Sequence, residues 1–351
     1  MKKIKSDYYK IVFNKFIFIV IGCLLLIVLV FFAAYVGAAK LSFQKISQAL
    51  LAKTLPFLGI EINKFAPTVV WDLRLPRIIM AIIAGFGLGI SGATMQGILR
   101  NPLVSPFTLG LSSAAGFGAA LAIVLGWGLV KGGPFFIIIN AFIFAVSAMV
   151  LVFFLSRLRS FNPETLILAG IAIMYLFSSM TSFLQYISDS DQLSGIVFWM
   201  MGSLATSTWL KVAISLAILL ISTTFLIKFS WEINAMVAGD EMAATLGTNV
   251  KAVRILCMSF STLIAAAIIS FTGVIGFIGL VAPHITRLII GNDYRYLLPL
   301  SGLTGAIFLL ISDTLARTVF QPSELPLSVM TSFIGVPFFV YILLTRRRNY
   351  F

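Results

Sequence analysis

The sequence predicts an all-α protein, a polytopic membrane bundle of about ten transmembrane helices, since one span needs roughly 20 apolar residues. Of its 351 residues, 60% are hydrophobic and 11% are charged, and the mean hydropathy is +1.06. Soluble domains carry about 25% charged residues, so this chain has too few to cover a water-exposed surface. Its apolar runs are continuous, without the alternation typical of membrane β-barrels. These observations exclude a soluble enzyme, a nucleic-acid-binding domain and a disordered tail.

The first apolar run follows a basic segment, residues 1–15, and extends from residue 16 to about residue 39. A cleaved signal peptide is the alternative, but its apolar core would be about 7–15 residues long. This run is longer, so we expect a retained first span. Nine further apolar runs predict the other spans, and one of them, 276–290, is short: 76–99, 103–128, 134–156, 164–187, 209–229, 251–273, 276–290, 297–316 and 327–345.

The basic residues predict the orientation of the bundle. With the N-terminus in the cytoplasm, ten spans place 16 of the 25 Lys and Arg residues inside, including Arg346 to Arg348, and 9 outside, including Lys131. Cytoplasmic loops of membrane proteins carry the excess of positive charge. The net charge of +13 is therefore interpreted as a topology signal, with both termini in the cytoplasm.

Small residues are concentrated in the second and third spans, where Gly85 and Gly89 stand four positions apart. Lipid gives helices no hydrophobic reason to associate, so faces of small residues allow the close backbone approach that packs them. We expect these glycines to pack helices tightly rather than to line a substrate path.

The reactive side chains are few. Cys23 and Cys257 both lie in apolar runs, and His284 is the single histidine, so the sequence offers no disulfide framework and no paired metal ligands. Asp313 and Arg317 are four residues apart, the spacing of an ion pair at a helix end. The spans lack the buried ionisable chain of a proton relay. The chain also lacks GxxxxGK[S/T], so the energy for uphill transport would come from another polypeptide.

The longest predicted cytoplasmic loop, residues 230–250, suits a docking helix. Acids begin its central stretch, helix-forming residues follow, and a glycine ends it: Asp240, Glu241, Ala243, Ala244, Leu246 and Gly247. An apolar helix face of this kind docks into grooves of partner proteins. The alternative is a helix lying on lipid, which normally has a basic polar face, whereas this one is acidic. We expect docking.

Two arginines, Arg74 and Arg77, stand on the predicted outer side, against the usual charge bias. The residues alone leave two interpretations open. The arginines either extend to lipid headgroups, or form a cationic surface for an acidic extracellular partner, since arginine binds carboxylates through two parallel hydrogen bonds.

A set of motifs in fixed order, from about residue 60 to 345, resembles the permease subunits of the iron–siderophore and cobalamin ABC importers, a binding-protein-dependent (type II) family. Any one motif could occur by chance, but the ordered set is specific. Members of the family have ten spans per subunit, which agrees with the count above. The motifs are Arg74-Leu75-Pro76-Arg77, Gly92-Ala93-Thr94-Met95-Gln96, Asn101-Pro102-Leu103, Trp199-Met200-Met201-Gly202, the loop from Gly239 to Gly247, the stretch from Gly276 to His284 with Arg287, and Glu324-Leu325-Pro326.

By position, the resemblance implies roles for three groups of residues. Arg74, Arg77 and Arg317 match outward arginines that receive acidic residues of the substrate-binding protein, which favours the cationic-surface interpretation. The coupling helices that press into the ATPase match Gly239, Asp240, Glu241, Ala244, Leu246 and Gly247. The cytoplasmic gate of the family matches Asn162, Pro163 and Glu164, although Pro163 and Glu164 depart from the small polar residues typical there.

The same resemblance covers Pro283 and His284, which fall in a signature near the cytoplasmic end of the eighth span. We expect Pro283 to shape its helix. For His284 we expect a structural hydrogen bond rather than a ligand-binding role.

The resemblance implies that residues 1–351 are one transmembrane permease domain of an ABC importer in a bacterial cell membrane. The expected substrate is an iron chelate, first a ferric siderophore, with cobalamin or haem as alternatives. A second permease subunit, two cytoplasmic ATPases that bind ATP and Mg²⁺, and an extracytoplasmic binding protein would complete it. The permease itself would bind no cofactor or metal and catalyse no reaction.

Two other classes of function remain to be compared with this one. An ion-coupled secondary transporter would need the intramembrane relay that the sequence lacks. A membrane scaffold or sensor would usually carry a soluble signalling domain, and the predicted inner segments are too short to fold on their own.

Overall fold

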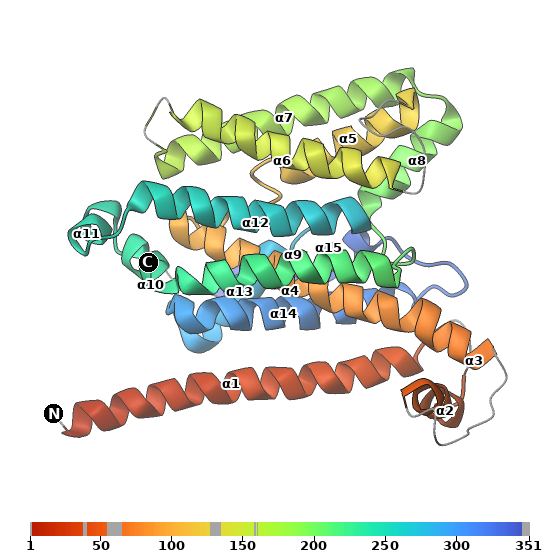
Figure 1. Cartoon of the computed structure of the whole chain (residues 1–351), viewed down its shortest axis with the longest axis horizontal. Helices are drawn as coiled ribbons and strands as arrows, with labels where there is room; N and C mark the ends of the chain where they lie inside the picture. Colours follow the sequence, from red (N-terminus) through yellow and green to blue (C-terminus); the bar gives the residue numbers. More distant parts are fainter. Residues whose placement is uncertain are drawn as a thin grey trace.

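The computed structural model describes residues 2–37, 41–54, 65–126, 135–157, 159 and 161–345; Lys131 and Arg346 to Arg348 lie outside them. Every regular element within these ranges is a helix, which confirms the all-α fold (Figure 1). The elements are α1 (Lys2–Tyr35), α2 (Phe43–Thr54), α3 (Phe65–Pro67), the π-helix η2 (Thr68–Arg74), α4 (Leu75–Ile98), α5 (Leu111–Leu125), α6 (Phe136–Arg157), α7 (Pro163–Ile187), α8 (Ser190–Met201), α9 (Trp209–Lys228), α10 (Ser230–Val237), α11 (Asp240–Thr245), α12 (Val250–Thr272), α13 (Ile278–Ile290), α14 (Tyr294–Ala316) and α15 (Leu327–Thr345).

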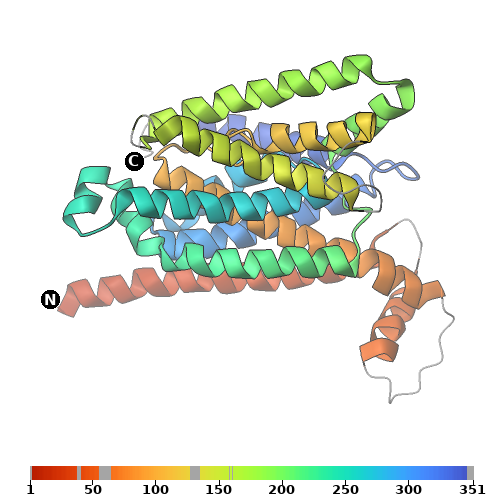
Figure 2. The ribbon, with the colours of Figure 1, turned by 45° about the horizontal axis from the view of Figure 1, so that its top comes forward.

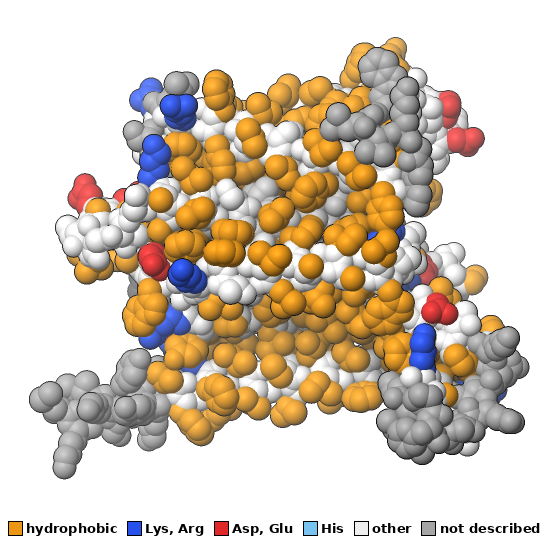
Figure 3. All heavy atoms as spheres, viewed as in Figure 1, with side chains coloured by type: hydrophobic (Ala, Val, Ile, Leu, Met, Phe, Trp, Pro, Cys, Tyr) orange, Lys and Arg blue, Asp and Glu red, His pale blue; other side chains and the backbone are white. Residues whose placement is uncertain are grey.

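The long helices run side by side between two ends of the molecule. Seven helical segments of the described chain are long and apolar enough to cross a membrane, and three shorter apolar helices, α5, α13 and part of α15, coincide with the other expected spans. On the face shown in Figure 3, hydrophobic side chains cover a broad middle zone and most of the charged ones gather at the two ends. The chain is therefore a multi-pass membrane protein.

Both ends of the helical chain lie at the same end of the bundle. The start of α1 and the end of α15 are at the end that carries α11, whereas α2 and α8 are at the opposite end (Figures 1 and 2). This arrangement fits an even number of crossings. The assignment of the α11 end to the cytoplasm stays a prediction.

Helix α4 forms the centre of the bundle and packs against α9, α12, α13 and α14. Helices α5, α6 and α7 form one flank, and α1 lies along α14 on the other (Figures 1 and 2). Most of the α4 side chains are buried, whereas α1 leaves large apolar side chains exposed between Phe13 and Tyr35. This difference suits a central helix and a helix at the lipid surface.

Close backbone approach through glycines holds α4 against its neighbours. A Cβ atom added at Gly85 would fall on the carbonyl oxygen of Gly305 in α14, and one at Gly89 on that of Ser301. A Cβ atom at Gly92 would fall on the backbone of Gly279 in α13. The prediction that these small residues pack the helices is confirmed.

The second expected span begins earlier than residue 76. The helix runs without interruption from Phe65 to Ile98, because η2 gives the Leu75 N–H the carbonyl of Val70 as its acceptor, five residues back. This wider turn precedes Pro76, whose lack of an N–H would otherwise mark a helix start. Arg74 and Arg77 therefore both lie within a continuous helix rather than in a loop before it.

The third expected span begins later than residue 103. Residues 101–110 form turns, in which Ser105 and Thr108 exchange backbone and side-chain hydrogen bonds, and Gly110 adopts φ of +84° before α5 starts. Val104, Ser105 and Leu109 are buried in this segment. Hydropathy alone could not separate these turns from a helix, because irregular backbone that is packed inside protein can be equally apolar.

The α11 end is held together by a charged cluster around Asp293, the N-cap of α14. Its carboxylate contacts Lys15 of α1 at 3.4 Å, Arg295 at 2.7 Å and the side-chain amide of Asn234 in α10 at 3.2 Å. Burial raises the pKa of this carboxyl, but the hydrogen bonds from Arg295 and Asn234 and the charge of Lys15 outweigh it and lower the pKa to about 2. The cluster therefore stays charged and ties α1, α10 and α14 together.

We expect Gly92→Ala to destabilise the bundle, because the added methyl group meets backbone that cannot move aside. Overpacking of this kind costs about 1–3 kcal/mol. Thermal unfolding of the purified protein would show a lower Tm. The matched control is Gly195→Ala in α8, where the nearest atom, Ile123 Cγ2, would lie at an ordinary 3.6 Å. Equal Tm values for the two variants would contradict this account of α4 packing.

Candidate functional site

Three of the predicted site residues meet at the α8 end of the bundle, in a cluster of buried charges. Arg77 of α4 binds Asp313 of α14 through two hydrogen bonds, at 3.0 and 3.2 Å from Nε, and its Nη1 binds Glu324 at 2.9 and 3.0 Å. The Asp313 side chain is 1% exposed and that of Glu324 is 43% exposed. Arg77 therefore joins a buried acid to a surface acid.

The predicted ion pair between Arg317 and Asp313 is confirmed, with 3.7 Å between Nε and Oδ2, which is longer than the 2.9 Å between Arg77 and Asp313. Its guanidinium also donates to the carbonyl of Ala33 in α1, while Nη1 of Arg74 donates to the carbonyls of Ala34 and Tyr35 at 2.6 and 3.2 Å. The last carbonyls of a helix lack partners within it and carry partial negative charge. Arg74 and Arg317 thus cap the end of α1.

Neither arginine that caps α1 is on the surface, since Arg74 and Arg317 are each 5% exposed. Both guanidinium groups donate hydrogen bonds to backbone carbonyls of α1. In this conformation, Glu324 is the acid that occupies the outward side of Arg77. A partner carboxylate that bound this cluster would have to compete with it.

At the opposite end, the predicted 230–250 loop forms two short helices, α10 and α11, joined at Gly239. Gly239 and Gly247 bracket α11 with φ of +126° and +85°, and the N–H of Thr248 closes the helix end on the carbonyl of Ala243. Positive φ favours glycine at both positions. The expected helix is present, but it is shorter than the 238–247 stretch.

One side of α11 faces the protein and the other is free of it. Ala243 is fully buried, whereas Met242 and Leu246 are 54% and 69% exposed and Glu241 is also exposed. An exposed pair of large apolar side chains on a six-residue helix is unusual beside an acidic residue. The geometry suits insertion of this helix into a groove.

Sequence reasoning missed one residue at this end, Arg254 in the second turn of α12. Its Nη2 binds both carboxylate oxygens of Asp240 at 2.8 and 2.9 Å, its Nε donates to the carbonyl of Ile98 at 3.2 Å, and its Nη1 donates to that of Phe161 at 3.3 Å. Arg254 is 2% exposed. In the sequence it counted only as one inner positive charge, although a charge placed five residues into an apolar helix could have marked it.

The predicted gate residues lie at the start of α7, beside this arginine. Asn162 is the N-cap and accepts a hydrogen bond from the Glu164 N–H at 3.2 Å, and Pro163 occupies the first turn, where a missing N–H costs nothing. The side chains of Asn162 and Glu164 are exposed. Pro163 and Glu164 therefore serve as ordinary helix-start residues here, and no contact places them across a pathway within this one chain's described residues.

The other signature residues pack α4 against α13. Arg287 donates to the side-chain oxygen of Gln96 at 3.1 Å, and the Gln96 amide donates to the carbonyl of Gly279 at 3.4 Å. His284 is buried, with its ring 6.4 Å from that of Phe339 in α15. Within the described residues, no group of three or more His, Cys, Asp or Glu side chains could hold a metal ion.

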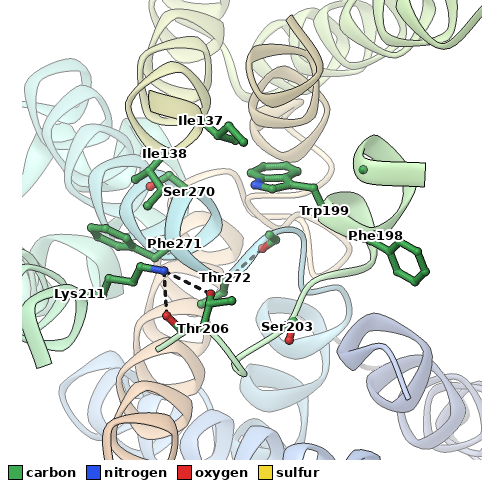
Figure 4. Close-up of a pocket in the computed structure, with 12 residues that line it drawn as sticks. Ile137, Ile138, Phe198, Trp199, Ser203, Thr206, Lys211, Ser270, Phe271 and Thr272 are labelled. Carbon is green, nitrogen blue, oxygen red and sulfur yellow. Dashed lines mark hydrogen bonds between the residues drawn. The ribbon is translucent and has the colours of Figure 1, made fainter. Parts of the chain in front are cut away.

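A cavity of about 370 Å³ opens near the α8 end, between α6, α8, α9 and α12 (Figure 4). Trp199 and Phe271 form much of its apolar wall, and the Lys211 ammonium donates to the carbonyl and hydroxyl of Thr206 at 2.8 and 3.2 Å. None of the residues predicted to have a docking, coupling or gate role lines it. The cavity is an open, mainly apolar recess rather than a site for a charged substrate.

The chain matches the FecCD transport family over residues 25–345. An ABC transporter permease of Methanocaldococcus jannaschii is 41% identical over 93% of this chain and 94% of that protein. The molybdate import permease of Haemophilus influenzae and the hemin transport permease of Yersinia pestis are each 36% identical, over 93% of this chain and 95% of each relative.

Among solved structures, a metal-chelate type ABC transporter in an inward-facing conformation has the same fold. It is 33% identical, with a TM-score of 0.82 over 93% of this chain and 99% of that one. The all-helical fold, the resembling motifs and these matches agree. The chain belongs to the FecCD transport family and is the permease of an ABC importer.

Proposed function

We propose that this permease carries an iron chelate, first a ferric siderophore, across the cell membrane into the cytoplasm. The observation that carries this proposal is where the charges of the spans lie. Arg77, Arg254, Arg287 and Asp313 lie toward one or the other end of the described bundle, and each is paired with another polar or charged group, so the middle of the bundle presents no unpaired charge. A wide, weakly charged route suits a large chelate. The similarity to a metal-chelate transporter and to a hemin permease supports the same class of substrate.

The substrate would pass between two permease subunits, identical or closely related. Supporting this, α7, α8 and α15 leave large aromatic side chains exposed, including Tyr175, Tyr186, Phe198 and Phe333. Aromatic side chains are enriched where protein surfaces associate. A second subunit that covers part of this face would leave the rest to line a path.

ATP hydrolysis would be performed by two cytoplasmic ATPases, each receiving one α11 helix. The exposed side of α11 supports this role, as Met242 and Leu246 could enter a groove while Glu241 remains at its rim. The permease would supply the path and the contact, without catalysing a reaction itself.

An extracytoplasmic binding protein would deliver the chelate to the α8 end. We propose that an acidic residue of this protein takes the place of Glu324 on Arg77, while Arg74 and Arg317 contribute positive potential from beneath. The cluster holds three arginines against two acids, which leaves it attractive to a further carboxylate.

Transport by vesicles that contain the permease, its ATPase and its binding protein should be tested with radiolabelled iron siderophores, ferric citrate, haem, cobalamin and molybdate. We expect ATP-dependent accumulation of a ferric chelate and none with a hydrolysis-deficient ATPase. Accumulation of molybdate or cobalamin alone would overturn the substrate class. Uptake driven by an ion gradient without ATPase would instead indicate the secondary-transporter alternative.

Glu324→Gln should tighten docking of the binding protein several-fold, because it frees the outward side of Arg77. Arg77→Gln should weaken docking. Both substitutions break the same ion pair, so a purely structural role would move them in the same direction. Surface plasmon resonance in nanodiscs would measure both, with Asp191→Asn in exposed α8 as a matched acidic control. Weaker docking of Glu324→Gln would contradict the competition between carboxylates.

A further inference from the structure

One buried guanidinium connects three inner elements of the permease. Each nitrogen of Arg254 serves a different one: Nη2 binds Asp240 in α11, Nε binds the carbonyl of Ile98 at the end of α4, and Nη1 binds the carbonyl of Phe161 just before α7. The planar guanidinium fixes these directions relative to one another. A displacement of Asp240 therefore changes the geometry at both carbonyls.

The two backbone segments that Arg254 binds are held in unfavourable conformations. Phe161 has φ of +58°, and Arg100, two residues after Ile98, has φ of +49°. Non-glycine residues rarely adopt such values and need their surroundings to keep them there. Lys251, one turn before Arg254 on α12, also places its ammonium 5.0 Å from the centre of the Phe161 ring. Phe161 therefore contacts α12 twice, through its carbonyl to Arg254 and through its ring to Lys251.

The acid in this arrangement is the one that a partner could move. Asp240 is the first residue of α11, and its side chain is 32% exposed, whereas that of Arg254 is 3% exposed. The second cation near Asp240 is Arg100, at 3.7 Å and 38% exposed, which is too distant and too solvated to replace the two short bonds of Arg254.

We propose that Arg254 is a positioning residue that transmits displacement of α11 to Phe161 and to the predicted gate residues that follow it, Asn162, Pro163 and Glu164. The inference rests on the proposed function only in assigning the displacement of α11 to an ATPase. The link itself belongs to the permease alone. When α11 moves, Asp240 draws the guanidinium with it, and the carbonyl of Phe161 loses or changes its donor. The start of α7 then gains freedom to shift.

Hydrogen exchange of the full-length permease in nanodiscs tests the link without any partner. The amides of Arg159 and Phe161 donate to the carbonyl of Ser156 at the end of α6, and that of Asn162 donates to the carbonyl of Arg159, so their exchange reports opening of the connection between α6 and α7. Asp240→Asn should speed exchange across 159–166 by about tenfold, although Asp240 itself does not contact that segment. Faster exchange confined to α11 would overturn the proposal. The control, Glu241→Gln, changes the adjacent exposed acid.

Arg254→Lys separates transmission from folding, because one ammonium can keep the pair with Asp240 but cannot also reach both carbonyls. We expect α11 to stay protected while 159–166 exchanges faster. If Arg254→Lys changed the exchange rates of α11 and of residues 159–166 equally, the three-way role of the guanidinium would be contradicted. The thermal unfolding of each variant shows that the bundle is intact.

A second measurement uses the complex with the ATPase. Asn162→Cys, in a chain with Cys23→Ser and Cys257→Ala, should change its reactivity toward a charged maleimide when ATP is added. With Arg254→Lys, the ATPase should still be captured by the permease, but the change should be lost. A normal ATP response would overturn the proposal. Failure of the unmodified permease to capture the ATPase would instead count against the proposed function and leave the exchange result to decide the link.

Discussion

The close approach of α4 to α13 and α14 is the constraint on which the rest of the structure depends. Lipid supplies no hydrophobic force between helices, so their association rests on contact at short range. At Gly85, Gly89 and Gly92, the backbones of neighbouring helices occupy the space that a side chain would take. These contacts fix the central helix, and the clusters around Arg77 and Arg254 are attached to its two ends.

The two clusters share one physical logic. A charge placed near the membrane interior is costly unless it is paired and hydrogen-bonded. Arg77 in the first turn of α4 contacts Asp313 and Glu324, and the carbonyl of Ile98 at the other end of α4 accepts a hydrogen bond from Arg254, which binds Asp240. The Arg77 cluster holds a buried acid, Asp313, and a partly exposed one, Glu324, whereas the Arg254 cluster holds a single, partly exposed acid, Asp240. Each cluster therefore holds neighbouring helices together and includes one acidic side chain that a partner could reach.

The sequence was sufficient for the features that depend on composition and local propensity. Continuous apolar runs predict the helices, and the acids at 240 and 241 with the terminating Gly247 predict a short helix on the 230–250 loop, which is α11. What could not be predicted depends on tertiary contacts. The burial of Arg74 and Arg317 on the end of α1 joins residues about 40 and 284 positions apart. The hydrogen bond from Arg254 to the carbonyl of Phe161 joins residues 93 positions apart. Hydropathy could not separate the partly buried turns at 101–110 from a helix.

The proposed roles of the Arg77 and Arg254 clusters depend on the orientation of the bundle in the membrane. The accessibility of single cysteines in intact cells tests this orientation most directly. Helices α11 and α8 lie at opposite ends of the molecule (Figure 1). Leu246, directly after α11, and Asp191, in α8, are both exposed. In a chain without its native cysteines, a membrane-impermeant maleimide should label Asp191→Cys in intact cells and Leu246→Cys only after lysis. Labelling of Leu246→Cys from outside, with protection of Asp191→Cys, would contradict an α11 that serves an ATPase and an outer cluster that serves a binding protein.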